Sequence, residues 1–447
     1  MSTRNNKKPK KDSIPTQTLT AVGKVVIPDD STALLLSLVG FSATKLWNSA
    51  LWHSKEAWAD TGKILKYGDM DKAMKKNRWY RTLHAQSAQA VLEEQWDSYK
   101  SWFKKRKEDP KAKPPGFRRE DSLSTVTFKK DSISWNPFSS ELRIGVQKSV
   151  FDKKYLYLKI QLPPKTIITS ESVQLARIVY EKGEWLVHLV RKIPLPKPKK
   201  EGRVMSLDLG IRHLAAWACS DGFTRVYSGG ELRALERYFE KEKSKCTDVC
   251  SNKRMDLESK RSRQRNHLIH VFTRSVINDA IARGVTTITV GKLKDIRNEK
   301  SGEAKNWGAS GNQDLHKWPY KKIFDQLKYK GALQGITVIE VSERYSSQTC
   351  SSCGKKRKAN RVHRGLYICK HCGATIHADV NGAINMLKKY LLAEGLALPA
   401  WSSGCLAQPV VNRFAWRKTK PLVRESGTFA GVRQHSSKQL QTARKAA

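Results

Sequence analysis

The sequence is short of acidic residues, and this shortage limits the partners that the protein can have. Asp and Glu number 41 against 84 Lys and Arg, which gives a formal net charge of +43. Such a surface repels itself unless a polyanion neutralises it, so the composition favours a nucleic acid partner. Basic residues also adjoin aromatic ones, as at 79–81 and 102–106. Each segment alone is equally typical of an exposed helix with buried aromatics, but the total charge favours contacts to phosphates and bases.

Long apolar runs and a secretion signal are also missing. No apolar run approaches the roughly 20 residues of a membrane span, so we expect no membrane partner. The first 12 residues are polar and carry four lysines without an apolar stretch after them, which argues against a signal peptide. We expect residues 1–18 to be a disordered basic arm that contacts phosphates, and a nuclear-import patch is the alternative.

Cysteine is scarce, yet four of the eight cysteines have the spacing of a metal site. They are Cys350, Cys353, Cys369 and Cys372. Two Cys-x2-Cys knuckles bring four thiolates to the corners of a tetrahedron around one zinc ion, and Gly354 and Gly373 allow the turn that each knuckle needs. A pair of disulfides is the alternative, which a cysteine-poor chain disfavours. We predict a structural zinc ribbon over residues 346–376, whereas Cys246 and Cys250 show no such pattern.

The first 200 residues read as a small β-barrel interrupted by helices. Alternating and helical apolar spacings predict a strand at 19–28, helices at 31–60 and 78–106, and a β-hairpin at 173–193. We assign the barrel to 19–30 and 120–198 and the helical insert to 31–119. The Pro- and Lys-rich segment 194–200 is a stiff linker, and it predicts a domain boundary.

Beyond this linker an apolar strand, 204–210, carries one carboxylate, Asp208, at its centre. A carboxylate in such a strand is costly unless something binds it. The next elements are two strands, a long basic helix at 231–283, a strand at 286–290, a helix at 318–333 and a strand at 336–341. This order is typical of a ribonuclease H-like fold, in which separated carboxylates converge on two divalent metals.

Phosphodiester hydrolysis explains why such carboxylates should converge. It needs a nucleophilic water and a stabilised leaving oxygen, which two magnesium ions about 4 Å apart supply when carboxylates hold them. Asp208 and Asp379, at the start of the last helix, are suitable ligands. Alone, Asp208 could be satisfied by backbone donors and Asp379 could be a helix N-cap. Both together, with the ribbon beside Asp379, favour metal binding.

Three segments resemble the signature of the TnpB family, transposon-encoded nucleases related to Fanzor proteins and type V CRISPR effectors. They are Ser206-Leu-Asp-Leu-Gly-Ile-Arg212, Tyr345-Ser-Ser-Gln-Thr-Cys-Ser-Ser-Cys-Gly354 and Ala378-Asp-Val-Asn-Gly-Ala-Ile-Asn385. The resemblance covers roughly residues 20–390; the anchors in the second half are specific, and those in the first half, such as Pro115-Gly-Phe-Arg118, are weak.

The resemblance implies an α/β plus all-β architecture. A wedge β-barrel with a helical recognition insert would precede a RuvC-type, ribonuclease H-like nuclease domain at 199–345 and 377–392, which holds the zinc ribbon as an insertion. The activity would be RNA-guided cleavage of DNA next to a short flanking motif. Guided recognition leaves sequence reading to base pairing, which suits a protein that grips backbones. The partners would be a guide RNA from the transposon end and double-stranded target DNA, and the cofactors structural Zn²⁺ and two catalytic Mg²⁺.

The chain departs from the family pattern at one position. The family's usual second carboxylate is a Glu at the end of the strand predicted at 286–290, where this chain has Gly291. Some TnpB members and Fanzor relatives resemble it in this and are thought to use a later Glu, where Glu343 stands. If the strands ending at Gly291 and Val341 are parallel neighbours, they lie about 4.8 Å apart, so Glu343 can reach the vacated space. Glu343 is therefore the predicted third ligand; Asp295, or no third ligand, are the alternatives.

Loss of the usual ligand also allows a different function, that of a nuclease-inactive RNA-guided DNA-binding protein that acts as a regulator. The presence of both Asp208 and Asp379 disfavours it, because a dead site needs no costly carboxylates. A third possible function is that of a transposase that joins DNA ends itself. The sequence shows no convincing Tyr or His-hydrophobe-His arrangement for that reaction.

Three further expectations concern exposed segments. The basic run 253–265, with Arg254, Lys260, Arg261 and Arg263, faces a guide–target duplex unless it is only a solvated helix face. Residues 295–316 form a mobile lid over the metals, and 393–447 form a disordered tail. The protein would be a monomer or homodimer, cytoplasmic and nucleoid-associated in a prokaryote or nuclear in a eukaryote.

Overall fold

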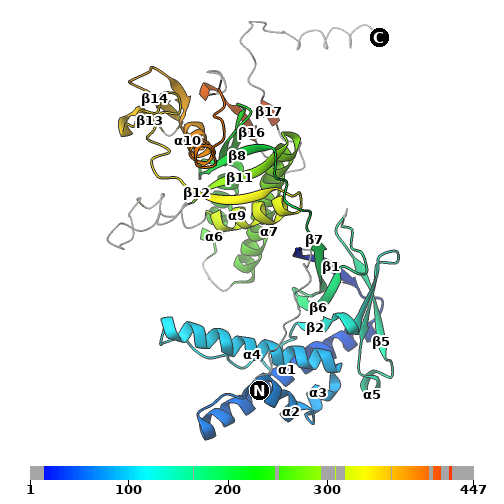
Figure 1. Ribbon diagram of the computed structural model, residues 1–447. Helices are drawn as coiled ribbons and strands as arrows, with labels where there is room; N and C mark the ends of the chain where they lie inside the picture. The colour runs from blue at the N-terminus through cyan, green and yellow to red at the C-terminus, as the bar shows by residue number, and fades with distance from the viewer. Residues whose placement is uncertain are drawn as a thin grey trace, which may run out of the picture. The chain divides into compact units, whose positions relative to one another are not determined.

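The computed structural model describes residues 15–164, 166–246, 251–292, 308, 318–363, 365–401, 406–413 and 422–424. The chain divides into two compact units, Met1–Pro194 and Leu195–Ala447 (Figure 1). The division lies at the first residue of the linker predicted at 194–200. Each unit combines strands with helices, so the predicted mixture of α and β structure is confirmed.

The N-terminal unit is built on a seven-stranded antiparallel sheet in the order β2-β6-β7-β1-β5-β4-β3. Its strands are β1 (Thr16–Val26), β2 (Val126–Lys129), β3 (Ile133–Asn136), β4 (Glu141–Gly145), β5 (Tyr155–Gln161), β6 (Val173–Glu181) and β7 (Glu184–Pro194). The β6–β7 hairpin turns at Lys182 and Gly183, whose positive φ values of 54° and 80° suit a two-residue turn. Edge strand β3 contacts β6, which is second from the opposite edge, so the sheet curls.

Four helices are inserted between β1 and β2, where the sequence predicts a helical insert. They are α1 (Asp30–Thr61), α2 (Tyr67–Met74), α3 (Arg78–Thr82) and α4 (Ala85–Glu108). Asp29 begins α1, since its carboxylate accepts a hydrogen bond from the Thr32 amide at 2.7 Å. The helix predicted at 78–106 is broken between α3 and α4, and Leu83, at the break, has extended backbone.

Helix α1 meets the length and composition of a membrane span, contrary to the expectation from the sequence. An 18-residue window within it has a mean hydropathy of at least 1.2, but 56% of that window is buried inside the structure. Leu36 and Leu46 of this helix belong to the hydrophobic core of the N-terminal unit. Its apolar character is therefore explained as that of a core helix.

The C-terminal unit contains three antiparallel strands and then two parallel ones. β8 (Arg203–Leu209), β9 (His213–Cys219) and β10 (Thr224–Ser228) form a meander. β11 (Val285–Lys292) pairs in parallel with β8 and with β12 (Thr337–Ser342), as the prediction for Glu343 requires. The sheet order is β12-β11-β8-β9-β10-β16-β17.

Helices cover both faces of this sheet (Figure 1). α6 (Gly230–Ser244), α7 (Asn252–Ala282) and α9 (Tyr320–Ala332) share a core with Leu207, and α10 (Ala378–Ala393) shares another with Val204. Because side chains alternate along a strand, Asp208 lies on the face of Val204. The position of Asp208 in β8 therefore directs its carboxylate toward α10.

The prediction of one long basic helix at 231–283 is wrong in one respect. The segment forms two helices, α6 and α7. Ser251 begins α7, since its hydroxyl accepts a hydrogen bond from the Arg254 amide at 3.4 Å. Cys250 lies outside the described residues, so the Cys246–Cys250 spacing cannot be compared with the structure.

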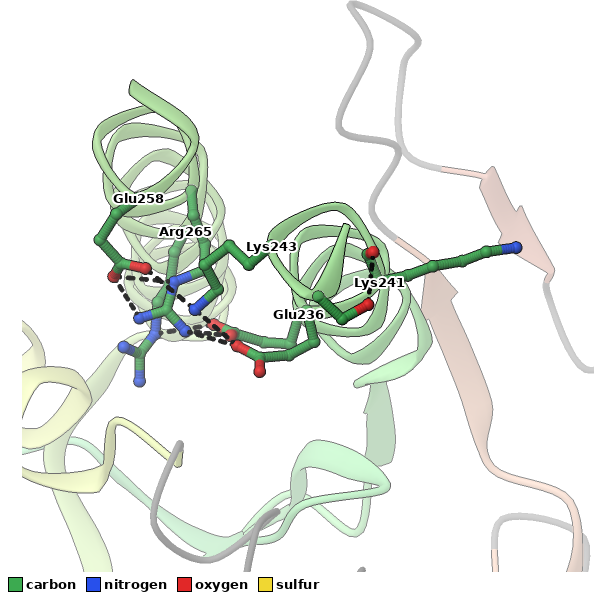
Figure 2. Close-up of polar contacts among 8 residues, drawn as sticks. Glu236, Lys241, Lys243, Glu258 and Arg265 are labelled. Atoms are coloured by element: carbon green, nitrogen blue, oxygen red, sulfur yellow. Dashed lines mark hydrogen bonds and ion pairs between the residues drawn. The ribbon is translucent and has the colours of Figure 1, made fainter. Parts of the chain in front are cut away.

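Ion pairs join α6 to α7 (Figure 2). Glu236 of α6 is buried and lies 2.8 Å from Arg261 and 3.2 Å from Arg265 of α7. Lys243 of α6 lies 3.1 Å from Glu258 of α7. These contacts replace the hydration that the buried charges lose, and they favour the antiparallel pairing of the two helices over one continuous helix.

The expected disordered tail at 393–447 is wrong where the structure describes it. β16 (Val410–Arg413) pairs in parallel with β10, and β17 (Leu422–Arg424) pairs with β16. Leu406 belongs to the core that α10 shares, Val411 packs against that core, and Val410 is also buried. Pairing with the sheet edge stabilises these short strands, whereas their own apolar periodicity is too brief to predict them. Likewise β1 begins at Thr16, inside the predicted N-terminal arm.

Three short strands lie between β12 and α10, in the segment predicted to be a zinc ribbon. β13 (Arg361–His363), β14 (Leu366–Ile368) and β15 (Thr375–His377) form an antiparallel sheet of their own. The last strand leads directly into α10, so the ribbon is joined to the helix that carries Asp379.

Candidate active site and metal centres

Asp208 approaches α10 at a glycine. A Cβ atom built on Gly382 would lie 2.3 Å from Oδ2 of Asp208, closer than any real contact, so a larger residue would displace the carboxylate. Burial raises the pKa of Asp208 well above its usual value, and the negative charges of Glu343 and Asp379 raise it further. Burial and the two neighbouring carboxylates therefore disfavour the negative charge of Asp208 unless a cation is present.

Glu343 occupies the space that Gly291 leaves free. Residue 291 pairs with Val341 in the parallel register of β11 and β12. A Cβ atom built on Gly291 would lie 1.9 Å from Oε1 and 2.6 Å from Cγ of Glu343. Oε1 of Glu343 is buried and has no hydrogen-bond partner among the described residues. Burial raises the pKa of Glu343 to about 7, although the Lys389 ammonium acts in the opposite direction.

Glu340 does not belong to this group. Its side chain is exposed, and its Oε1 lies 3.2 Å from the hydroxyl of Tyr320, which also lies 2.9 Å from the Gly291 carbonyl. This agrees with the alternation of side chains along a strand, which places residues 340 and 343 on opposite faces. Asp295, the alternative third ligand, lies outside the described residues, as does the predicted lid at 295–316 apart from Gly308.

Asp379 is the second residue of α10 and makes two polar contacts. Its Oδ2 lies 2.8 Å from Nδ1 of His213, and its Oδ1 accepts a hydrogen bond from Arg361 at 3.0 Å. Burial acts to raise the pKa of Asp379, but the hydrogen bond from His213 and the nearby positive charges lower it overall. Residue 377 occupies the N-cap position, so Asp379 is not the cap that the sequence allowed as an alternative.

The four ribbon cysteines form a ligand cluster that fits zinc. Their sulfurs all lie within 4.8 Å of one another, with 3.8 Å between Cys350 and Cys372 and 3.6 Å between Cys353 and Cys369. Tetrahedral Zn–S bonds of about 2.3 Å place neighbouring sulfurs about 3.8 Å apart. Burial acts to raise the pKa of Cys369, but backbone amides of Cys372 and of the residue before it lower it to about 6. A thiolate at neutral pH is the form that zinc binds.

Two asparagines, which the sequence analysis did not assign, attach α10 to the first zinc knuckle. Asn381 accepts a hydrogen bond from the Ser351 amide at 2.9 Å and donates to the Thr349 carbonyl at 2.8 Å. Asn385 donates to the carbonyls of Ser346 and Thr349 at 2.8 and 2.6 Å. Their spacing of four residues on one helix was the available signal. The knuckle and the helix that carries Asp379 are therefore one braced structure.

The predicted nucleic-acid face of α7 is only partly available. Lys260 and Arg263 are exposed, whereas Arg261 is turned toward α6 and contacts Glu236 and Glu258. Because Arg261 is already engaged in ion pairs within the protein, the prediction that it faces a guide–target duplex is wrong. An exposed face with Lys260 and Arg263 remains.

In the N-terminal unit, the weak anchor 115–118 is held firmly against α1. The Asn48 side chain makes hydrogen bonds of 2.9 Å to both the amide and the carbonyl of Arg118. The Arg118 guanidinium lies 3.8 Å from the ring centre of Trp47 and 2.9 Å from Glu94. Trp47 also lines a cleft of about 890 Å³ together with Trp102 and residues 113–116. The wall of this cleft therefore combines aromatic and polar side chains.

Comparison with known proteins gives two family matches. A family model described as "Cas12f1-like, TNB domain" matches residues 320–386, which include the ribbon and the start of α10. A second, described as "Probable transposase", matches residues 177–297, which include β8 and β11.

Individual relatives match over much of the chain. TnpB-like protein ORF457 of Acidianus two-tailed virus is 25% identical over 78% of this chain and 81% of its own length. "Putative RNA-guided DNA endonuclease InsQ" of Escherichia coli K12 is 24% identical over 76% of this chain and 85% of its own. CRISPR-associated endodeoxyribonuclease Cas12f1 of Syntrophomonas palmitatica is 26% identical over 43% of this chain, but the match spans only 40% of that protein.

A solved structure shares the fold. The Cas12f1 chain of a Cas12f1-sgRNA-target DNA complex, determined by cryo-electron microscopy, aligns with a TM-score of 0.53 at 14% identity, over 83% of this chain and 98% of that chain. Two family matches, relatives matched over about four fifths of their own length and this shared fold agree with the three sequence signatures. The chain is a member of the TnpB family.

Proposed function

We propose that the protein is an RNA-guided DNA endonuclease of a transposable element. It hydrolyses target DNA phosphodiesters in a RuvC-like site, guided by an RNA from the transposon end. The observation that carries the proposal is the fit of Glu343 into the space beside Gly291, with one buried carboxylate oxygen that has no partner among the described residues. A dead site would have no reason to keep a relocated carboxylate in a position that costs free energy.

The sheet of the C-terminal unit supports the RuvC-like assignment. Its order β12-β11-β8-β9-β10, with β8 to β10 antiparallel and β11 and β12 parallel, is that of a ribonuclease H-like fold. Asp208 lies near the end of β8, Glu343 follows β12, and Asp379 lies at the start of α10. Relatives with endonuclease in their names support the same activity.

Asp208, Glu343 and Asp379 would hold two magnesium ions. Bound magnesium supplies a water nucleophilic enough to attack the phosphodiester, and it stabilises the leaving oxygen. The raised pKa values of Asp208 and Glu343 mean that each carboxyl keeps its proton more readily until a cation replaces it. Gly382 lets Asp208 come close to α10, and the two contacts of Asp379 fix its orientation.

The other parts of the chain would bind the nucleic acids. The N-terminal unit would be a wedge β-barrel with recognition helices, which its curled sheet and helical insert support. The four cysteines would hold a structural zinc ion that braces α10 through Asn381 and Asn385. The net charge of +43 suits a guide RNA and double-stranded target DNA. The protein acts as a monomer or homodimer, in the nucleoid of a prokaryote or the nucleus of a eukaryote.

Cleavage of a plasmid library with randomised flanks tests the proposal. The protein is purified with its co-expressed transposon-end RNA and supplied with Mg²⁺, beside Asp208→Ala and Glu343→Gln variants. Glu340→Gln is the matched control, because Glu340 lies three residues away and is exposed. We expect guided cuts by the wild type and by Glu340→Gln, and none by the other two.

Two results would contradict the proposal in different ways. Cuts that persist in Glu343→Gln would remove Glu343 from the site while leaving a guided nuclease. Tight RNA-dependent DNA binding by the wild type without any cut would instead establish the nuclease-inactive regulator.

A further inference from the structure

Two histidines lie beside Asp379, outside the predicted set of carboxylates. His213 is the first residue of β9, and His377 ends β15 and caps α10. One ligand atom from each of His213, His377 and Asp379 lies within 4.8 Å of the others. The two imidazole rings are 5.2 Å apart between centres. Three separate elements thus bring two ring nitrogens and one carboxylate oxygen to the same point.

Hydrogen bonding explains only part of this cluster. The 2.8 Å contact between His213 and Asp379 satisfies one pair of atoms. Nδ1 of His377 is buried and has no hydrogen-bond partner among the described residues. A buried nitrogen without a partner is costly, and a native structure usually supplies a partner for it.

The donor atoms distinguish this cluster from the magnesium site. Magnesium prefers oxygen ligands, whereas Zn²⁺, Mn²⁺ and related ions accept imidazole nitrogen together with a carboxylate oxygen. Arg361 donates a hydrogen bond to Oδ1 of Asp379 at 3.0 Å, whereas Oδ2 contacts His213. The positive charge of Arg361 repels a cation bound at this point, so only an ion with high affinity for the donor atoms would bind. An ion with strong affinity for imidazole is therefore the appropriate occupant.

We propose that His213, His377 and Asp379 form a binding site for a borderline transition-metal ion, with Zn²⁺ as the ion favoured by this donor set. The site is additional to the four cysteines of the ribbon. Because Asp379 belongs to both this site and the proposed magnesium site, occupancy of one opposes occupancy of the other. The consequence, which rests on the proposed function, is that free Zn²⁺ inhibits guided cleavage and excess Mg²⁺ relieves the inhibition.

Binding is measured without DNA or cleavage, so the test does not depend on the proposed function. Purified protein with its ribbon zinc retained, at one zinc per chain, is titrated with Zn²⁺ against a chromophoric chelator. We expect one further site in the wild type. His213→Ala and His377→Ala should each weaken it by at least about ten-fold, because each removes a direct ligand. Arg361→Ala should strengthen it, since a positive charge next to the ion is removed.

Two controls define the site. His363→Ala removes an exposed ribbon histidine and should leave the further site intact. Glu343→Gln should also leave it intact, because Glu343 is not a ligand. Thermal melting of each variant shows whether it is folded, and His377→Gln repeats the ligand removal with a smaller loss of packing.

Three outcomes would overturn the proposal. They are no Zn²⁺ bound beyond the ribbon ion, a further site that survives both histidine substitutions, and a further site that is lost in Glu343→Gln. The first two would leave His213 as a residue that only orients Asp379. The third would assign the ion to the carboxylate site. None of these outcomes depends on whether the protein cuts DNA, so each is separable from a failure of the proposed function.

Discussion

The cysteine cluster and the carboxylate cluster, each of which we propose to hold cations, are assembled in opposite ways. The four cysteines lie within one short segment, 350–372, and the knuckle turns set their positions. The carboxylates come from 208, 343 and 379, and two glycines, Gly291 and Gly382, leave the space that they fill. A local site depends mainly on its ligands. A site assembled across a sheet depends equally on residues that contribute no ligand at all.

The largest effect should come from moving the glutamate back to its usual strand. Gly291→Glu alone should abolish cleavage, because the Cβ atom of the new residue would lie only 1.9 Å from Oε1 of Glu343 and would displace that side chain. Glu343→Ala alone should also lose on the order of 10³-fold or more, as expected for loss of an ion ligand. The double variant should regain much of the activity. Single-turnover cleavage rates measure all three, and failure of the double variant while it still binds DNA would mean that position 291 cannot substitute for 343.

A second substitution adds one methyl group beside Asp208. Ala normally stabilises a helix relative to Gly by about 1 kcal/mol, so Gly382→Ala should be harmless to α10 itself. The added Cβ would lie 2.3 Å from Oδ2 of Asp208, so we expect a loss of about 10²-fold in the cleavage rate from a misplaced ligand. Gly373→Ala, at a positive φ of 71° in the second knuckle, is the contrasting variant and should weaken zinc retention instead. Equal zinc loss in both would contradict the separation of the two sites.

The asparagine brace tests whether the local site is truly independent of the other. Asn385→Ala removes two hydrogen bonds to carbonyls at the first knuckle, and we expect a loss of about 1–3 kcal/mol in stability. Cleavage should require more Mg²⁺, while the ribbon keeps its zinc, because α10 shifts relative to the strands. The Mg²⁺ concentration for half-maximal cleavage is the measurement. An unchanged value with lowered stability would reduce Asn385 to a purely structural residue.

The smallest effect concerns pH in the absence of magnesium. The pKa of Glu343 is about 7 in the folded protein against 4.5 ordinarily, so the folded state binds more protons between these values. The stability contribution is therefore present below pH 4.5 and is lost as the pH rises through about 7. We expect a fall on the order of 1–3 kcal/mol in the free energy of unfolding. Mg²⁺ should reverse it at pH 8, and Glu343→Gln should reduce it, as followed by denaturant unfolding.

The sequence predicts features that depend on nearby residues better than those that depend on distant ones. The knuckle spacing around Cys350 predicts the ribbon, and a single carboxylate in an apolar strand identifies Asp208. The geometric argument that Glu343 reaches the space beside Gly291 assumes that β11 and β12 pair in parallel, and the structure confirms this pairing. Its role as a ligand stays a prediction.

Other features depend on partners that the local sequence does not reveal. His213 and Asp379 are 166 positions apart, so their contact leaves no local pattern. β16 is too short to recognise without the edge of β10 beside it. The division of the long basic helix depends on Glu236, whose pairing with Arg261 only the packed helices reveal.

The exclusion between residues 291 and 343 has a consequence for comparing relatives. Because a side chain at 291 would displace Glu343 from the volume that it fills, we expect a chain to carry a carboxylate at one of the two positions. The two positions should therefore covary, with a small residue at one whenever the other is Glu. A survey that demands a carboxylate only at the end of β11 would discard this chain as a degenerate copy. Treating positions 291 and 343 as one position would retain this chain and would separate two arrangements of the same predicted set of carboxylates.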